Sequence, residues 1–173
     1  FALVRYHYNI DKQHSKADRI FRATSQFKNT EGGDDFNTPG VPYPFGTAIR
    51  SDFPQIEQLA MIEEQENPMV LIDEKGKYQK FKNTNSDEKG AFVEPSFFKI
   101  FDYQWIAGSP IDLKNPNTVV LSKKYAEKYF GSTDCIGKVI KYDGRLSLKI
   151  VGVFIDYDDN TDFPFDLMPS YAS

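Results

Sequence analysis

The two histidines of the chain are the first residues whose type could support metal chemistry. His7 and His14 are seven residues apart, so on a helix they would lie on the same side. A zinc site on a helix needs ligands four residues apart or a third ligand nearby, and two helical turns are too far for one ion. The spacing therefore favours two solvent-exposed histidines on a linker helix over a zinc site.

A second candidate for metal binding is the acidic stretch from Asp156 to Asp162. Its aspartates and Asn160 supply oxygen ligands of the kind that Ca²⁺ prefers. An EF-hand loop starting at Asp156 needs glycine at its sixth position and glutamate at its twelfth, where this chain has Thr161 and Leu167. The EF-hand motif is therefore excluded. A solvated loop is the favoured interpretation, and a weak calcium site is the alternative.

The sequence motifs of common enzymes are missing. The sequence contains no G-x-S-x-G nucleophile turn and no phosphate-binding loop with its lysine. A carboxylate pair for glycoside chemistry is not excluded, because acid and base meet only in the fold. Lys123, Lys124 and Lys128 form a basic face on a predicted helix, which is either solvated or a contact for an anionic lipid or a partner. We therefore predict no catalytic residue, no metal and no cofactor.

Composition limits the class of protein further. The 173 residues are 40% hydrophobic and 15% aromatic, which is enough for a sizeable core. The net charge of -4 argues against a nucleic-acid binder, and the single cysteine, Cys135, excludes a disulfide within the chain. The longest apolar run, from Ile150 to Ile155, is too short to span a membrane. Because the chain begins with Phe1 rather than methionine, we expect it to be part of a longer protein.

The most clearly specified elements lie in the second half of the chain. A strand is predicted over 119–121, and Ser122 after it is a good N-cap for a helix. Gly131 ends that helix, since only glycine enters the left-handed conformation at little cost. The helix carries a one-sided apolar stripe of Tyr125, Ala126, Tyr129 and Phe130. A turn at Asp143-Gly144 then predicts a hairpin whose second arm, 146–155, enters a covered sheet.

The first half of the chain carries weaker signals. Residues 55–65 are ambiguous, since 55–60 suit a helix and a strand could start at Leu59. The remaining patterns predict a strand over 19–27, a loop over 29–40, a helix over 43–53, a hairpin over 69–81 that turns at Gly76, and a short strand followed by a helix from Pro95 to 101. The only tryptophan, Trp105, follows.

Five stretches of the chain resemble the MacB-like periplasmic core domain of FtsX/MacB-type ABC transporter permeases, in the form found in Bacteroidetes-type permeases. They are ADRIFRAT (17–24), DFPQIE (52–57), FVEPSFFKIFDYQWIAGSP (92–110), NTVVLSKKYAEKYFGSTDCIGKVIKYDG (117–144) and IVGVFIDYDDNTDFPFDLMPS (150–170). The helix that ends in Tyr-Phe-Gly, followed by Ile-Gly-Lys, is the most specific part. The chain departs from the pattern at Cys135, where proline is usual, and at Asp162, where histidine or a similar residue is common.

The resemblance implies an α+β fold with two lobes. A porter-like lobe of strand–helix–strand units would comprise residues 17–110 and 150–173, and a smaller sabre-like lobe, residues 111–149, would be inserted into it. Residues 1–16 would form a membrane-proximal stalk outside the core. The resemblance also implies that 58–64 is a strand, and that relatives continue beyond residue 170. We expect structural roles for Ser122, Gly131, Gly137, Asp143, Gly144 and Trp105.

The function implied by the resemblance is mechanical. Such a domain faces the periplasm at the bacterial inner membrane and transmits ATP-driven motion to export or extract a peptide, drug or lipoprotein. The ATP would be hydrolysed by a separate cytoplasmic ATPase, so the domain itself is not an enzyme. Expected partners are that ATPase, a second permease copy and a periplasmic adaptor or outer-membrane protein, but no nucleic acid. The alternatives are a periplasmic ligand-binding or sensor module and, less favoured, a periplasmic hydrolase.

Overall fold

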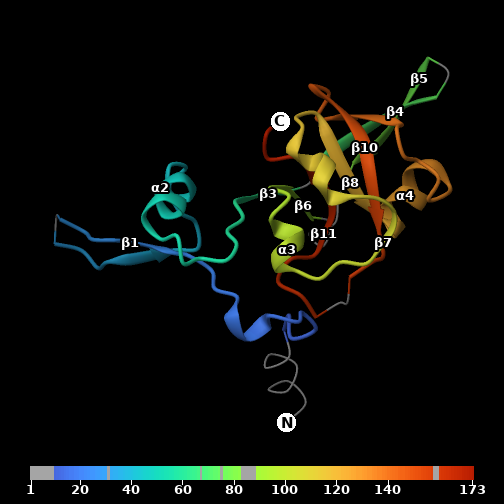
Figure 1. Cartoon of the computed structure of the whole chain (residues 1–173). Helices are drawn as coiled ribbons and strands as arrows, with labels where there is room; N and C mark the ends of the chain where they lie inside the picture. Colours follow the sequence, from blue (N-terminus) through green and yellow to red (C-terminus); the bar gives the residue numbers. More distant parts are fainter. Residues whose placement is uncertain (1–9, 31, 67, 75, 83–88, 158–159) are drawn as a thin grey trace, which may run out of the picture.

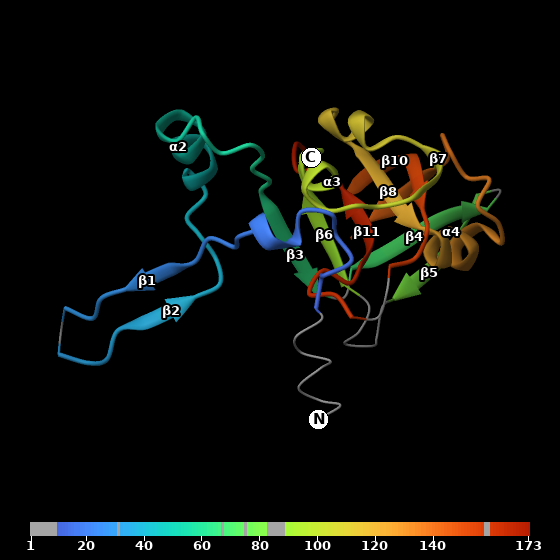
Figure 2. The same ribbon diagram turned by 60° about the horizontal axis from the view of Figure 1, so that its bottom comes forward.

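The computed structural model describes residues 10–30, 32–66, 68–74, 76–82, 89–157 and 160–173. Within these residues the chain divides into a body, built on a large curled sheet, and an arm that projects from it (Figures 1 and 2). The arm is residues 20–59. The mixed α+β fold predicted from the sequence is confirmed.

The sheet of the body has nine strands in the order β3-β6-β11-β8-β10-β9-β4-β5, with β7 paired to β10 beside β9. The strands are β3 (Ile62–Glu66), β4 (Met69–Glu74), β5 (Lys77–Lys82), β6 (Lys89–Val93), β7 (Trp105–Gly108), β8 (Thr118–Ser122), β9 (Val139–Tyr142), β10 (Leu146–Phe154) and β11 (Phe165–Pro169). The β8–β10 and β6–β11 pairs are parallel, and all others are antiparallel. Strand β10 is long enough to pair with β9 along its first half and with β7 along its second.

Strand β8 lies in the middle of the sheet and is buried on both faces. Val119 and Leu121 belong to one hydrophobic cluster, while Val120 belongs to another, because successive side chains of a strand point to opposite faces. The sequence of a strand that is buried on both faces is a continuous apolar run, without alternation between apolar and polar residues. The predicted strand over 119–121 is therefore confirmed, extended by one residue at each end.

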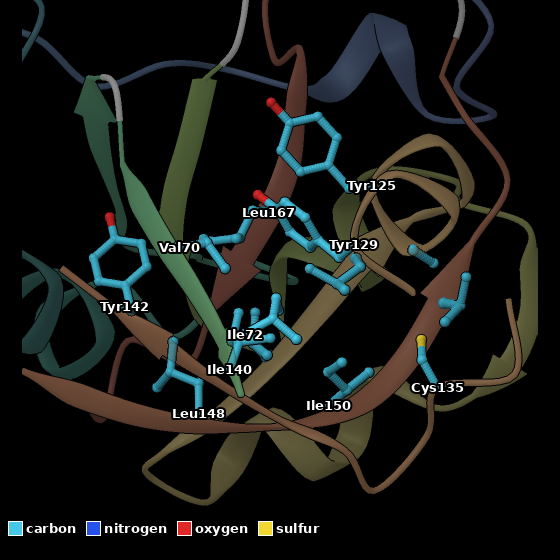
Figure 3. Close-up of a cluster of buried hydrophobic side chains, with 14 residues drawn as sticks. Val70, Ile72, Tyr125, Tyr129, Cys135, Ile140, Tyr142, Leu148, Ile150 and Leu167 are labelled. Carbon is cyan, nitrogen blue, oxygen red and sulfur yellow. The ribbon is translucent and has the colours of Figure 1, made fainter. Parts of the chain in front are cut away.

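Helix α4 (Lys123–Phe130) covers the first of these faces. It begins and ends as predicted: the backbone N–H of Tyr125 donates to Ser122 Oγ over 3.2 Å, and Gly131 has a φ of 70°. Figure 3 shows Tyr125 and Tyr129 extending from α4 among side chains of several strands. The cluster includes Val70, Ile72, Cys135, Ile140, Tyr142, Leu148, Ile150 and Leu167.

The second face is covered by the short helix α3 (Phe97–Ile100) and the 3₁₀ helix η2 (Pro110–Lys114). This cluster is aromatic, and the ring centroids of Phe97 and Phe101 lie 4.7 Å apart. Aromatic pairs at this distance add stabilisation beyond that of their buried area. Two cores on opposite faces make the sheet the rigid part of the molecule.

The expected inserted lobe does not stand apart from this sheet. Residues 111–149 contribute β8, α4, β9 and the start of β10, and these strands pair with β4 and β11, which lie outside that range. The boundaries at 111 and 149 thus fall within one continuous sheet. A larger structural difference separates the arm from the body.

The arm contains the stretch 20–24, the two-stranded ribbon of β1 (Ser25–Phe27) and β2 (Phe36–Thr38), and helix α2 (Phe45–Asp52). None of its described hydrophobic residues is part of the buried core, and Phe21, Phe27, Phe36, Tyr43, Phe53 and Ile56 are exposed. The predicted strand over 19–27 is wrong up to residue 24, since Ile20 to Thr24 have no partner strand. The expected helix over 43–53 is confirmed as α2.

The segment before the arm also corrects an expectation. Residues 1–9, including His7, lie outside the described residues, but residues 10–16 lie against the body. His14 is only 8% exposed and its ring meets that of Phe101, so it is not a solvent-exposed histidine. The stalk predicted over 1–16 therefore cannot extend as far as residue 16. Residues 10–16 contact the body, and the 3₁₀ helix η1 (Ala17–Arg19) follows them and leads into the arm.

The strand pairing in the sheet tests two other predictions for the first half of the chain. The hairpin over 69–81 is confirmed as β4 and β5, with a φ of 85° at Gly76. The ambiguous stretch 55–65 is a strand only from Ile62 onward, where β3 pairs with β6. No helix in the described part of the chain is long and apolar enough to cross a bilayer.

Candidate functional site: the groove at the base of the arm

A concave region of the described residues lies where the arm meets the body. It consists of two adjoining hollows, about 570 Å³ and 360 Å³ in volume, which together are called the groove here. Helix α2 forms one wall, and the segment between β6 and α3 forms the other. Arg50, Glu94 and Pro95 line both hollows, so they divide one from the other.

An ion pair spans the groove at this dividing line. The guanidinium of Arg50 on α2 donates to the carboxylate of Glu94, and the same nitrogen lies 3.3 Å from the carbonyl oxygen of Leu59. Glu94 also accepts from the backbone N–H of Met61 over 2.9 Å. Arg50 therefore links helix α2 to Leu59, which lies shortly before β3, and to Glu94, which directly follows β6. Because the Arg50 side chain is 44% exposed, solvent screens this pair.

Close packing fixes the helix beside the pair. A Cβ atom at Gly46 would lie 2.6 Å from the sulfur of Met61, so only glycine lets α2 approach this closely. Next to it the rings of Tyr43 and Tyr171 stack in near-parallel planes with centroids 6.3 Å apart. The helix is thus held at one point by packing and at another by charge, with little buried area between.

A second charged contact holds the outer end of the groove. Glu57 accepts a hydrogen bond from the Lys16 ammonium and lies 3.4 Å from the guanidinium of Arg19. The hydrogen bond and the charge of Lys16 lower the pKa of Glu57 below its usual range. All three side chains are well exposed, so this contact orients the arm more than it stabilises the fold.

The groove combines apolar side chains with a few polar groups. Ser96, its one lining serine, donates its hydroxyl hydrogen to the carbonyl oxygen of Leu59 over 2.7 Å. No histidine or cysteine is among the described lining residues, and the carboxylates that line the same hollow are those of Glu57 and Glu94. What remains is a surface of exposed apolar side chains around one ion pair.

The residues predicted to be structural lie in the body, away from the groove. At the turn between β9 and β10, Asp143 and Gly144 have φ angles of 47° and 68°, which is the geometry of a tight hairpin turn. Gly137 has a φ of 84°, and its N–H donates to the carbonyl oxygen of Ile150 over 2.8 Å. Trp105 packs over Gly152, where a Cβ atom would lie 2.5 Å from its ring.

Two residues of the acidic loop, Asp156 and Asp162, form hydrogen bonds with other parts of the chain. Asp156 Oδ1 accepts from the backbone N–H of Lys124 over 2.8 Å at the start of α4, and the backbone N–H of Asp162 donates to Asp11 over 3.1 Å. Asp158 and Asp159 lie outside the described residues. The described part of the chain contains no group of three side chains placed to hold a metal ion. Asp156 and Asp162 are both solvent-exposed, which agrees with a solvated loop, and each also takes part in one of these hydrogen bonds.

The basic face of α4 makes contacts with its own surroundings. Lys123 lies 3.9 Å from Glu127, one helical turn away, and the ammonium of Lys128 lies 4.8 Å from the centroid of the Tyr125 ring. The lysine side chains are solvent-exposed, which agrees with the solvated alternative and leaves a partner contact untested. Lys124 is different, because it lies beside a buried carboxylate.

That carboxylate is Asp166 on β11, which is 1% exposed. Its Oδ2 accepts from the Tyr157 hydroxyl over 3.3 Å and lies 3.7 Å from the Lys124 ammonium, and its carboxylate also bonds the hydroxyl of Ser122. Burial raises the pKa of Asp166 above its usual value despite these partners. The cluster joins the start of α4 to the sheet, so we regard it as structural.

Sequence reasoning did not identify Arg50, Glu94, Asp11 or Asp166. Charged residues of this kind are common in the chain. Arg50 and Glu94 are 44 residues apart, and Asp11 and Asp162 are 151 apart, so no local pattern singles them out. One signal was available: Gly46 is a glycine within a helical pattern, which often marks a close approach of backbone to another element.

With this geometry established, comparison with known proteins assigns the family. The family model for the MacB-like periplasmic core domain matches residues 4–172, and the chain therefore belongs to this family. Its members are periplasmic domains of permease-type transporter proteins rather than catalytic domains. Comparison with curated proteins gives no significant match.

Solved structures agree on the fold. A domain assigned to a permease protein from Porphyromonas gingivalis matches with a TM-score of 0.67 and 22% identity, over 87% of this chain and 65% of that one. The periplasmic region of MacB from Actinobacillus actinomycetemcomitans matches with a TM-score of 0.52 and 13% identity, over 73% of this chain and 55% of that one. The chain thus spans less than two thirds of either solved domain.

Proposed function

We propose that this domain is the extracytoplasmic part of an ABC transporter permease and transmits ATP-driven motion across the membrane. The observation that carries the proposal is the family match over 169 residues, 4–172, combined with a body that has a core on each face of one sheet. A mechanical element must move as a unit, and a hydrogen-bonded sheet packed on both faces resists deformation.

The partners follow from that role. A separate cytoplasmic ATPase would supply the energy through the membrane helices of the permease, and a second permease copy would complete the transporter. A periplasmic adaptor or outer-membrane protein would receive the substrate, which would be a peptide, a drug or a lipoprotein. The domain would lie at the periplasmic face of the bacterial inner membrane. No role for nucleic acid is proposed, since the net charge is -4.

The movable unit within the domain is, on this proposal, the arm. Its junction with the body consists of exposed ion pairs, the close packing at Gly46, the stacked rings of Tyr43 and Tyr171, and the partly buried Ile20, whereas the strands of residues 111–149 are hydrogen-bonded into the body. Exposed ion pairs are weak, so the arm can change its angle at little cost in free energy. A porter-like and a sabre-like lobe remain our proposal for the longer protein, with motion located at the arm.

A flexible insertion tests the mechanical function directly. A glycine-serine stretch inserted near Gln13 of the full-length permease should uncouple the chain before Gln13 from the body of the domain, because a random coil transmits little force. We expect ATP hydrolysis by the transporter to continue while transport falls. The matched control is the same insertion at Gly76, in the turn of the β4–β5 hairpin, which should leave transport unchanged. Unimpaired transport with the Gln13 insertion would contradict the mechanical function.

The groove favours one alternative, a ligand-binding or sensor module. Binding pockets combine apolar walls with a few polar groups that fix orientation, and the groove has Arg50 and Glu94 in that position. If the domain binds peptides, their addition should shift the amide resonances of Arg50 and Met61 more than those of β8. Titration of a mixed peptide library, followed by nuclear magnetic resonance, makes this comparison. Shifts that do not gather at the groove would eliminate this alternative.

A further inference from the structure

The segment that precedes the arm is fastened to the body at two separate loops. Residues 10–16, which we call the N-terminal clamp, lie beside the loop 101–104, between α3 and β7, and the loop from 155 to 164, between β10 and β11. Figure 1 shows the corresponding blue segment below α3 and β11, and the turned view of Figure 2 brings it to the front. Each loop leads directly into a strand of the large sheet.

His14 and Ser15 hold the first loop by two hydrogen bonds to Asp102, one in each direction. The Nδ1 atom of His14 accepts from the backbone N–H of Asp102 over 3.1 Å, and the carboxylate of Asp102 accepts from the backbone N–H of Ser15 over 2.5 Å. The edge of the imidazole ring contacts Phe101, with centroids 5.1 Å apart and planes at 73°. A buried ring that satisfies a backbone donor and packs on an aromatic fixes this position precisely.

Asp11 holds the second loop through both of its carboxylate oxygens. One accepts from the hydroxyl of Thr161 over 2.5 Å, and the other accepts from the backbone N–H of Asp162 over 3.1 Å. The backbone N–H of Asp11 donates to the carbonyl oxygen of Asn160 over 3.2 Å. Asp11 does this in a left-handed conformation, with a φ of 55°, which an aspartate adopts only when its surroundings require it.

The two halves of the clamp act on one structural unit. The Nε2 atom of His14 lies 3.8 Å from Asp11, so the two residues also contact each other. Beneath them Phe101 of the first loop and Phe163 of the second are in ring contact, with centroids 4.7 Å apart. A displacement of the clamp therefore reaches β7 and β11 together, through hydrogen bonds short enough to transmit it.

We propose that Asp11 and His14 are the coupling residues of the domain: they deliver any displacement of the preceding chain to the sheet through the loops at 101–104 and 160–164. The role of the clamp in transport rests on the proposed function. The contacts of the clamp with the two loops do not. Asp11 and His14 are positioning residues, since they act by holding loops and touch no reacting group.

Hydrogen exchange on this chain tests the clamp itself. In Asp11→Ala and His14→Ala, exchange of amide hydrogens in 101–104 and 160–164 should accelerate about tenfold, because each change removes hydrogen bonds that close these loops. Exchange in β8 and the thermal midpoint should change little. Gln13→Ala, in the same segment and solvent-exposed, is the matched control. Unchanged exchange in both loops would overturn the proposal.

The full-length permease with its ATPase tests the coupling role. Asp11→Ala and His14→Ala should each lower the substrate transported per ATP hydrolysed at least threefold, while Gln13→Ala should not. Asp11→Cys combined with Thr161→Cys replaces the hydrogen bond with a covalent link, which should restore the ratio when oxidised and lose it again on reduction.

The outcomes separate the clamp from the function on which it rests. If the insertion near Gln13 uncouples transport but Asp11→Ala and His14→Ala do not, the clamp is not the coupling point and the mechanical function stands. If the insertion itself leaves transport intact, the mechanical function fails. Loosened loops in the hydrogen-exchange experiment without any loss of coupling would reduce the clamp to a structural anchor and so contradict the proposal.

Discussion

Met69 and Asp143 are joined by two hydrogen bonds that run in opposite directions. The backbone N–H of Met69 donates to Asp143 Oδ1 over 2.8 Å, and the backbone N–H of Asp143 donates to the carbonyl oxygen of Met69 over 2.8 Å. The first residue of β4 is thereby attached to the turn between β9 and β10. Asp143 thus does more than form its turn, which was the only role that its sequence position indicated.

The variant Asp143→Ala should lower the free energy of unfolding by about 2 kcal/mol, from the lost side-chain hydrogen bond and the left-handed backbone. Asp143→Asn keeps an acceptor oxygen and tolerates that backbone, so it should cost much less. Urea denaturation of the three proteins measures the difference. Equal stability of the alanine and asparagine variants would show that the bond to Met69 contributes nothing.

The burial of Asp166 should make stability depend on pH. Its pKa is raised in the folded protein, so between the unfolded and folded pKa values only the folded state holds the proton. Stability therefore falls as pH rises through this window, and ionised Asp166 is unfavourable above it. Asp166→Asn should be more stable than the wild type at pH 7, with an advantage that shrinks as the pH falls toward 4. Urea denaturation between pH 4 and pH 8 measures this, with the exposed Asp134→Asn as the control; an advantage that is independent of pH would contradict the assignment.

Two glycines with similar φ angles should respond very differently to alanine. At Gly131 an added Cβ meets no atom within 4 Å, so Gly131→Ala should cost only the backbone strain, about 1 kcal/mol. At Gly108 the Cβ would lie 2.0 Å from the carbonyl oxygen of Val151, so Gly108→Ala should cost more than about 3 kcal/mol. Thermal or chemical denaturation of both variants separates strain from steric overlap. An unchanged melting temperature in Gly131→Ala would be inconsistent with this argument.

Removal of Arg50 should free the arm without unfolding the body. Arg50→Ala deletes the ion pair with Glu94, which is exposed enough to contribute no more than about 1 kcal/mol to stability. Distances between spin labels at Lys28 on the arm and Lys149 on the body should broaden in this variant. Arg50→Lys, which keeps the charge, is the control and should broaden them less. An unaltered distance distribution in Arg50→Ala would place the rigidity of the junction elsewhere, for example in the contact of Gly46 with Met61.

Local elements were predictable where consecutive residues decide the structure. The cap at Ser122, the stop at Gly131 and the turn at Asp143-Gly144 depend on interactions within a few residues, and each has the expected local geometry. The strand predicted over 19–27 forms only from Ser25 onward, because its earlier part depends on a distant partner rather than on neighbouring residues. Alternation there was clear, but a strand forms only with a partner, and Ile20 to Thr24 have none.

The candidate site was not predictable, because its parts are distant in the sequence. Arg50 and Glu94 are 44 residues apart, and Asp11 and Thr161 are 150 apart. The burial of His14 depends on a ring at Phe101 that no local pattern connects to it. The family resemblance supplied the fold class and the expected function, but its motifs are structural and did not indicate where the arm meets the body.

The order of the strands has a consequence for how the domain assembles after export. Val70 pairs with Tyr142, and Gly90 pairs with Leu167, so the sheet closes only through contacts between distant parts of the chain. Such a topology folds slowly compared with one built from local contacts. Strand β11 lies next to central β8 and completes its burial, yet it is the last of the described strands in chain order. Residues from 62 to 169 must therefore all be available before this core can close, and until then the apolar strands are exposed to aggregation.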